Sequence, residues 1–443
     1  MLRATTAVQA PPRPMGKVTA ATIVGNTIEF YDFNVYGTLT ALVFGRLFFS
    51  AQDPVLGTFM AFATFGVGFL ARPLGGVVFG HFGDKFGRKP VLVASLLTMG
   101  LATALMGFLP TLAAAGILAP ILLITLRFIQ GFGLGGEWGG AITLMMETAP
   151  QKKRGIFGAA VQTGSGLGII LATATVTALA TLLTPQQMFD WGWRIPLLFS
   201  FVLVIAGLII RSKIDESPEF KQLEKSAKVV KAPLWETLRH HYKMVLVAIG
   251  MYIAVAAFGF TQGVFFVSYL LNTVHVSQAT ATTANLIAAV TYLLATLLGG
   301  WLSDKLTRTR AYVIGACLLI PAPFIMFAAG STGSVPVIFT AMALVGALGG
   351  VAYGAQAALF FELFPARIRY TGISLGFQFA AVLGGGLTPL LGASLAQSTG
   401  STLPVSIYIA GLAVLMIICT LVAPRILRAQ QQSDADEQTR ASN

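Results

Sequence analysis

The chain has 443 residues, of which 55% are apolar and only 10% are charged, and its mean hydropathy is +0.77. Soluble domains carry about a quarter charged residues, so this composition excludes a single water-soluble core and a disordered chain and predicts an all-α, polytopic membrane protein. The net charge of +12 does not indicate nucleic acid, because the basic residues lie in short segments between apolar runs. The two cysteines and four histidines show no disulfide or metal-ligand spacing, so we expect no metal site and no cofactor.

Twelve apolar runs are long enough to cross a bilayer as helices, which takes about 20 residues each. They cover residues 18–44, 55–80, 91–109, 117–146, 155–183, 193–210, 244–271, 279–301, 311–329, 335–361, 372–396 and 405–422. The first run follows a polar tail, is too long for the core of a signal peptide and contains two acidic residues. We therefore expect it to be a membrane span rather than a cleaved signal.

Basic residues set the expected orientation. When the N-terminus is placed in the cytoplasm, most of the 29 Lys and Arg residues fall in the two tails and in the cytoplasmic loops. The longest polar stretch separates six runs from six, and its segment 219–225 is typical of either an amphipathic helix on anionic lipid or a solvated linker. We expect a cytoplasmic N-terminal tail at 1–17, a six-helix half at 18–210, a cytoplasmic central loop at 211–243, a second six-helix half at 244–424 and a cytoplasmic C-terminal tail at 425–443.

The two halves repeat each other weakly. Residues 80–88 (Gly-His-Phe-Gly-Asp-Lys-Phe-Gly-Arg) follow the second run, and residues 300–308 (Gly-Trp-Leu-Ser-Asp-Lys-Leu-Thr-Arg) follow the eighth. Residues 147–154 after the fourth run and 362–369 after the tenth share a Glu, a Pro and a final Arg. Two matches at corresponding places predict a duplicated half, the architecture of alternating-access transporters.

With these motifs the chain resembles transporters of the major facilitator superfamily, and more narrowly the metabolite:proton symporters, which include permeases for shikimate, oxoglutarate, citrate and proline/betaine. The resemblance is carried by residues 25–33 (Gly-Asn-Thr-Ile-Glu-Phe-Tyr-Asp-Phe), 83–89, 127–141 and 216–220 (Glu-Ser-Pro-Glu-Phe) and spans the whole chain. It implies twelve transmembrane helices in two pseudo-symmetric halves, in a monomeric carrier of the bacterial inner membrane. The loop motif at 83–89 specifies only the superfamily, and no motif specifies the substrate.

Five charged residues lie well inside the predicted spans, all in the first half, and such groups are costly enough in hydrocarbon to indicate function. They are Glu29, Asp32, Arg72, Arg127 and Glu137. Glu29 and Asp32 are three residues apart and share a helix face. Arg127 reaches a similar depth from the other end of the fourth helix, so we expect an Asp32–Arg127 pair. Resembling sugar–proton symporters couple an aspartate and an arginine at these places.

The five charges sum to −1 when all are ionised, and both burial and a second carboxylate disfavour the ionised form. We therefore predict that Asp32, or next Glu29 and then Glu137, carries the coupled proton. Protonation would release an arginine, Arg127 before Arg72, to hold an anionic substrate. The alternative is that all of these residues form permanent ion pairs that hold the helices together.

The resemblance places the substrate between the halves, on the first, fourth, seventh and tenth helices. The predicted binding residues are Asn26, Tyr36, Arg72, Arg127, Gln162, Gln262, Phe266, Tyr269, Tyr353 and Gln356. Uncharged polar and aromatic groups opposite an arginine-bearing half suit a small organic anion such as a mono- or dicarboxylate. For each residue singly, the alternative is a packing contact between helices.

The loop motifs are predicted to form a gate. Asp84 can accept hydrogen bonds at a neighbouring helix N-terminus, and Arg88 and Lys89 can pair with acidic groups such as Glu147. The resemblance implies that such contacts lock the cytoplasmic ends together in the outward-open state. The predicted gating residues are Gly83, Asp84, Gly87, Arg88, Lys89, Glu147, Arg154, Asp304 and Arg308. Because serine and threonine replace two glycines in the second copy, we expect a looser backbone approach there.

We therefore predict a proton-coupled symporter that imports a small organic anion by alternating access, with the solute, protons and the lipid bilayer as its partners. The alternatives are a symporter of betaine or proline, a drug–proton antiporter and a channel. The segment 425–443 shows no apolar heptad, which argues against the osmosensing betaine carriers with a long coiled-coil tail. An enzyme is not predicted, because the sequence shows no nucleophile with a base at membrane depth.

Overall fold

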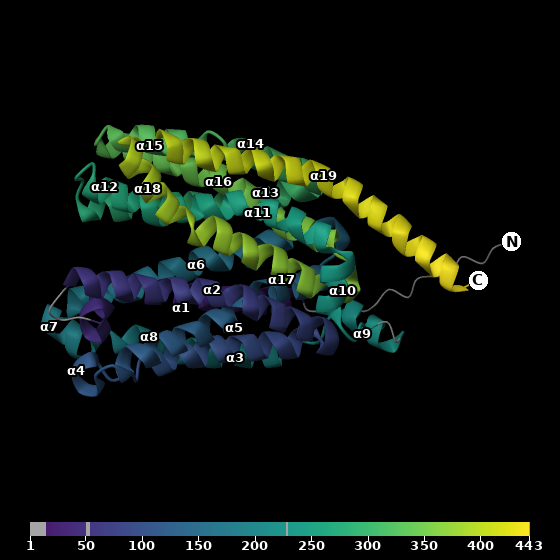
Figure 1. Ribbon diagram of the computed structural model, residues 1–443, viewed down its shortest axis with the longest axis horizontal. Helices are drawn as coiled ribbons and strands as arrows, with labels where there is room; N and C mark the ends of the chain where they lie inside the picture. Colours follow the sequence, from purple (N-terminus) through teal and green to yellow (C-terminus); the bar gives the residue numbers. More distant parts are fainter. Residues whose placement is uncertain (1–14, 50–53, 227–228, 443) are drawn as a thin grey trace.

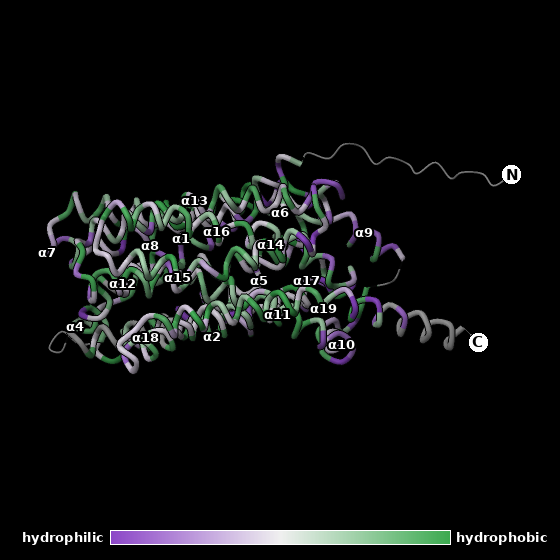
Figure 2. Tube along the Cα trace, turned by 90° about the horizontal axis from the view of Figure 1, so that it is seen from above, coloured by the Kyte–Doolittle hydropathy of each residue, from purple (hydrophilic) through white to green (hydrophobic). Residues whose placement is uncertain are grey.

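The computed structural model describes residues 15–49, 54–226 and 229–442, and within them the chain is helical throughout, without a strand. The helices form two bundles that lie side by side, the N-terminal half in purple and blue and the C-terminal half in green and yellow (Figure 1). Helices α9 (Pro218–Lys225) and α10 (Pro233–His240) lie at one end of both bundles, together with the end of α19. We call this end, where hydrophilic residues gather in Figure 2, the basic end.

The N-terminal half contains six long helical stretches joined by short turns. They are α1 (Met15–Leu39) with the π-helical η1 (Thr40–Phe49), α2 (Pro54–Phe86), α3 (Arg88–Met106), α5 (Leu118–Thr148), α6 (Arg154–Leu182) and α8 (Arg194–Ser212). The turns at the end opposite the basic end include α4 (Leu112–Ala115), α7 (Pro185–Gln187) and η3 (Met188–Gly192).

The C-terminal half repeats this plan with more interruptions. Its stretches are α11 (Tyr242–Phe260), η4 (Thr261–Phe265) and α12 (Phe266–Asn272); α13 (Gln278–Lys305); α14 (Arg308–Leu319) and α15 (Ala322–Ser331); α16 (Val335–Leu363); α17 (Arg369–Ala380), η6 (Ala381–Gly386) and α18 (Thr388–Thr399); and α19 (Leu403–Ser442). Ten stretches of the described residues are long and apolar enough to cross a membrane. With α1 and α2, which pack among them, they give the predicted fold of twelve helices in two halves.

Close packing of the corresponding helix pairs α2–α5 and α13–α16 uses glycine in both halves. A Cβ on Gly75 of α2 would lie 1.8 Å from the Phe132 carbonyl oxygen of α5, and one on Gly354 of α16 would lie 1.8 Å from the Thr296 carbonyl oxygen of α13. Only glycine permits this approach, which replaces the hydrophobic effect as a source of helix association in lipid. The glycine-rich fourth span packs in the same way, since a Cβ on Gly135 of α5 would lie 2.1 Å from the Arg72 carbonyl oxygen of α2.

Candidate functional site

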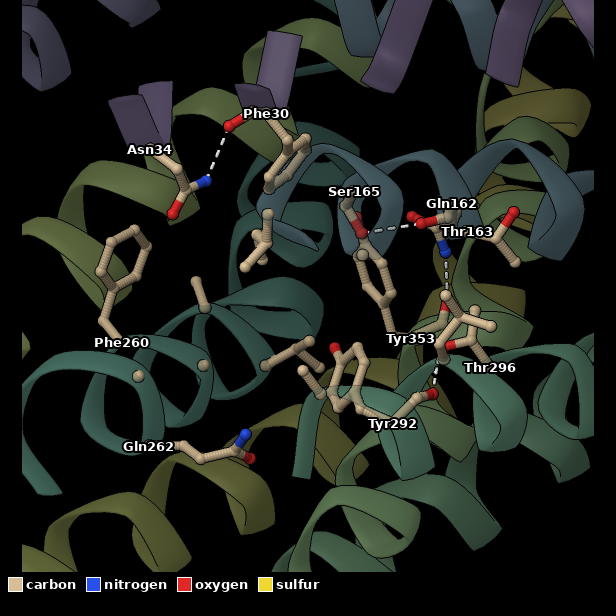
Figure 3. A pocket seen from close by; sticks show the side chains of 18 of the residues that line it. Phe30, Asn34, Gln162, Thr163, Ser165, Phe260, Gln262, Tyr292, Thr296 and Tyr353 are labelled. Carbon is tan, nitrogen blue, oxygen red and sulfur yellow. Dashed lines mark hydrogen bonds between the residues drawn. The ribbon is translucent and has the colours of Figure 1, made fainter. Parts of the chain in front are cut away.

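A cavity of about 260 Å³ lies between the two halves. The N-terminal half contributes α1 and α6, and the C-terminal half contributes α11, η4, α13 and α16. In Figure 3, Asn34 and Phe30 of α1 lie across the view from Gln262 and Tyr292 of the C-terminal half. The side chains that line the cavity and matter here are Phe30, Phe33, Asn34, Gln162, Ser165, Tyr252, Phe260, Gln262, Asn285, Tyr292, Thr296 and Tyr353. Among the described residues, the lining contains amides, hydroxyls and aromatic rings but no charged group.

Three of the predicted binding residues, Gln162, Gln262 and Tyr353, line this cavity. Gln162 joins the halves there, because its amide donates a hydrogen bond to the Tyr353 carbonyl oxygen and accepts one from the Trp138 indole at 3.2 Å. Gln262 lies in the π-helical turn η4, and its side-chain oxygen makes no hydrogen bond to a described residue. Three further lining residues, Asn285, Tyr292 and Thr296, were not predicted from the sequence, although all three lie on one face of α13.

The other predicted binding residues do not line the cavity, and packing explains several of them. Asn26 donates a hydrogen bond to the Val161 carbonyl oxygen of α6 at 2.8 Å, and the Tyr36 hydroxyl bonds to Thr64 at 2.7 Å. Phe266 and Tyr269 pack around Phe327 inside the C-terminal half, with ring centroids 5.6 and 5.5 Å from it. Gln356 is completely buried in α16. In this structure they lie in helix interfaces rather than in the cavity wall, and their role in substrate binding stays a prediction.

Asp32 and Arg127 are both buried, but a direct ion pair is absent between these two described residues. Asp32 accepts hydrogen bonds from Ser200 at 2.5 Å and from Thr103 at 2.9 Å. Thr103 in turn accepts one from Gln130 at 2.7 Å, and Arg127 donates to Gln130. The expected direct pair is wrong because α3 inserts Thr103 between the two residues, and a chain of hydrogen bonds connects them instead.

The second carboxylate, Glu29, contacts Arg72 of α2 at 3.3 Å. The Arg72 guanidinium lies over the rings of Phe33 and Phe69, at 4.8 and 5.5 Å from their centroids. The guanidinium of Arg127 lies 5.1 Å from the centroid of the same Phe33 ring. Phe33 also lines the cavity. Arg72, which the sequence ranked last, thus lies one side-chain layer from the cavity.

The third carboxylate, Glu137, pairs with a residue that the sequence analysis placed in the central loop. Arg211, at the end of α8, contacts both oxygens of Glu137, and Ser95 donates to the same carboxylate at 3.2 Å. Glu137 and Arg211 are only 1% and 2% exposed. A Cβ on Gly25 would lie 1.9 Å from Arg211 Nη2, so glycine at that position makes room for the pair.

Arg211 changes the sum of the charges that was predicted for the residues buried at membrane depth. The buried charge set, which we define as Glu29, Asp32, Glu137, Arg72, Arg127 and Arg211, holds three carboxylates and three arginines and sums to zero rather than −1. A permanently unbalanced charge at membrane depth is costly. The sum of −1 predicted for five residues was therefore a signal that a sixth, positively charged residue was missing from the set.

At the basic end, each half caps a helix of the other. Asp84 accepts hydrogen bonds from the backbone N–H groups of Tyr370 and Thr371, at the start of α17, at 3.2 and 2.8 Å. Asp304 accepts two from the start of α6, at 2.7 and 2.8 Å. These carboxylates satisfy N–H groups that a helix leaves unpaired and face the positive end of its dipole. The helix-terminus contact predicted for Asp84 is confirmed, and Asp304 makes the corresponding contact in the second copy at similar distances.

Arginines and acids complete the contacts around these caps. Arg88 pairs with Glu147 at 3.2 Å and donates to the Ala366 carbonyl oxygen of the other half at 2.9 Å. Arg369 bridges the halves to Glu147 at 3.2 Å. In the second copy Arg308 pairs with its own Asp304 at 2.7 Å and donates to the Gln151 carbonyl oxygen. Lys89 differs from the prediction, since its side chain donates to the Ser212 carbonyl oxygen at 3.0 Å rather than pairing with Glu147.

The motif glycines are required by space. A Cβ on Gly83 would lie 2.0 Å from Cδ1 of Tyr370, and Gly87 has φ = 108° with Glu216 directly beside it. The central-loop helix α9 lies nearby, and its Glu219 contacts Arg154 of the N-terminal half at 3.3 Å and Arg369 of the C-terminal half at 2.5 Å. The amphipathic helix predicted at 219–225 therefore exists and touches both halves.

All inter-half hydrogen bonds of the described residues lie at the level of Gln162 or closer to the basic end. Along α6 the contacts with Asp304 come first, then the Gln162–Tyr353 bond, and then the residues that line the cavity. A layer of hydrogen bonds between the two halves therefore separates the cavity from the basic end.

Comparisons with known proteins agree with this geometry. A sequence model of the family described as Major Facilitator Superfamily matches residues 22–375 and, in a second match, 248–442. The inner membrane metabolite transport protein YhjE of Escherichia coli K12 is 38% identical over 419 residues, which is 93% of this chain and 94% of that protein. The shikimate transporter of the same strain is 38% identical over 397 residues, 89% of this chain and 91% of that protein.

A proline/betaine transporter of Salmonella typhimurium is 32% identical over 410 residues, 90% of this chain and 81% of that protein. Among solved structures, the proton:xylose symporter XylE bound to 6-bromo-6-deoxy-D-glucose superposes with a TM-score of 0.75 at 15% identity, covering 93% of this chain and 96% of that one. The chain belongs to the major facilitator superfamily. Within it, the relatives are metabolite transporters, so the protein is an integral membrane transporter and not an enzyme.

Proposed function

We propose that the protein is a proton-coupled symporter that imports a small organic anion across the bacterial inner membrane. One observation carries the proposal: a cavity lined by amides, hydroxyls and aromatic rings lies between the halves, directly against the half that contains the buried charge set. Buried ionisable groups in membrane proteins mark ion and substrate pathways. The relatives named as shikimate and proline/betaine transporters support a small organic solute.

The basic end faces the cytoplasm in this proposal, because basic loops are retained on that side of the membrane. The reciprocal Asp84 and Asp304 caps then close the cytoplasmic side, and import requires that they open after the opposite side has closed. The cavity lies within one chain, so the carrier works as a monomer.

Two carboxylates are candidates for the coupled proton, Asp32 and Glu29. Glu137 is better understood as part of a permanent ion pair, because both of its oxygens are held by Arg211 and one also by Ser95. This interpretation divides the buried charge set into a structural pair and two sites that can exchange a proton.

A zwitterion is the second candidate substrate. Tyr252, Tyr292, Tyr353 and Phe260 line the cavity, and aromatic faces attract quaternary ammonium groups. Relatives named as proline/betaine transporters favour the same possibility.

The test is uptake of labelled shikimate and labelled glycine betaine into proteoliposomes that contain the purified full chain, with and without an inside-alkaline pH gradient. We expect shikimate to accumulate only when the gradient is present. Conductance without concentrative uptake would favour a channel, and accumulation that ignores the pH gradient would contradict proton coupling.

A further inference from the structure

We propose that Arg72 binds the carboxylate of a monoanionic substrate while Glu29 takes the coupled proton, so that one proton and one negative charge enter the buried charge set together. This inference rests on the proposed function and specifies the charge of the substrate and the residues that exchange partners.

The Glu29–Arg72 pair is the most loosely held of the buried acidic contacts. One oxygen of Glu29 lies 3.3 Å from Arg72 Nη2, while the other oxygen and Arg72 Nε are buried without a hydrogen-bond partner among the described residues. By contrast, both oxygens of Asp32 accept short hydrogen bonds and both oxygens of Glu137 contact an arginine. A buried polar atom without a partner costs about 1–3 kcal/mol, so Glu29 and Arg72 gain most from a new partner.

The pair also lies beside the cavity. Arg72 contacts the ring of Phe33, which lines the cavity. Its side chain retains 8% exposure, compared with 2% or less for Glu29 and for the residues of the Glu137–Arg211 pair. Because Phe33 contacts the guanidinium and also lines the cavity, a substrate carboxylate at the cavity wall would lie one side-chain layer from Arg72.

The summed charge of the buried charge set indicates the charge of the substrate. The groups that face Glu29 are Arg72 from α2, Glu137 from α5, Arg211 from α8 and Tyr353 from α16. Glu137 and Arg211 neutralise each other, so protonation of Glu29 leaves Arg72 with an uncompensated positive charge. An unpaired buried charge is strongly unfavourable.

A monoanion that enters with the proton restores the sum to zero. A zwitterion would leave a charge of +1 in the buried set, and a dianion would leave −1. When one proton enters on Glu29, the empty and the loaded carrier have the same buried charge only with a monoanion, and both can then change conformation without moving an unbalanced charge through the bilayer.

The experiment uses the full chain in proteoliposomes with labelled shikimate and labelled glycine betaine, at a fixed pH gradient, while a potassium diffusion potential is imposed or cancelled. We expect shikimate uptake to change less than twofold with the potential, and a pH electrode to record one proton per shikimate. Uptake that rises several-fold with an inside-negative potential, or a preference for betaine, would overturn the inference and leave a proton-coupled carrier in place. If neither shikimate nor glycine betaine accumulates, the proposed function is wrong and the inference fails with it.

Variants identify the residues. Arg72→Gln is expected to raise the half-saturation concentration about tenfold to hundredfold, as for the loss of a charged hydrogen bond. Glu29→Gln is expected to retain shikimate exchange and lose accumulation driven by the pH gradient, while Glu29→Asp, which keeps a titratable group, regains part of that accumulation. Monodisperse elution in detergent excludes misfolding as the cause. If Glu29→Gln keeps pH-driven accumulation and Asp32→Asn loses it, the proton belongs to Asp32 and the assignment is wrong.

Discussion

Neutralising Glu137 should destabilise the fold far more than neutralising an acid in an exposed pair. Glu137→Gln removes the carboxylate that holds Arg211 and leaves the arginine charge 2% exposed, in a space shaped by Gly25. Breaking a buried ion pair by removing one partner costs about 3–5 kcal/mol, because the remaining charge is neither solvated nor compensated.

The matched control is Glu236→Gln. Glu236 pairs with Arg367 at 2.6 Å, but these side chains are 21% and 36% exposed. Water can solvate the arginine that remains, so we expect a loss of at most about 1 kcal/mol. The two variants make the same chemical change on an arginine-bound glutamate and differ mainly in burial.

The assay is unfolding from mild-detergent micelles by titration with a denaturing detergent, followed by far-ultraviolet circular dichroism. The double variant Glu137→Gln/Arg211→Gln removes both charges, and we expect it to recover part of the stability lost in Glu137→Gln. If Glu137→Gln is no less stable than Glu236→Gln, Glu137 is not a structural partner of Arg211, and its place among the proton carriers would have to be reconsidered.

Three further changes test the gate and the cavity. Asp84→Asn removes the charge that caps α17, and we expect the population of the conformation closed at the basic end to fall about tenfold. The measurement is the rate at which an impermeant thiol reagent, added from that end, labels a cysteine introduced into the cavity; this rate should rise. Gly83→Val places its side chain where the Tyr370 ring lies; uptake should fall at least tenfold at normal yield, and normal uptake would refute the tight contact. Gln262→Ala should raise the half-saturation concentration about two- to tenfold with unfolding unchanged, and an unaltered value would exclude Gln262 from binding.

The spans were predictable because lipid offers the backbone no hydrogen-bond partner, so an apolar run of sufficient length must be helical. The run predicted at 335–361, for example, became α16 (Val335–Leu363). Interruptions inside runs were missed. The run at 311–329 breaks at Pro321, which lacks a backbone donor, and the runs at 244–271 and 372–396 contain the π-helical turns η4 and η6. Hydropathy does not report the register of backbone hydrogen bonds.

The chemistry of the site was only partly predictable. The sequence identified five of the six members of the buried charge set, because charge inside an apolar run is a strong signal. It missed Arg211, whose position at the end of a span suggested a loop residue, whereas the long arginine side chain reaches back into the bundle. The pairing of Asp32 was also missed, because Thr103 and Ser200 come from other helices and the direction of each side chain depends on helix rotation.

The exchanged aspartate caps have a consequence for the timing of the transport cycle. Since Asp84 and Asp304 each belong to one half and hold a helix end of the other, neither half can satisfy its own N–H groups at this place. When the halves separate, both carboxylates and both helix ends must become hydrated in the same movement. The inner seal should therefore release in a single cooperative event, with one rate constant rather than two.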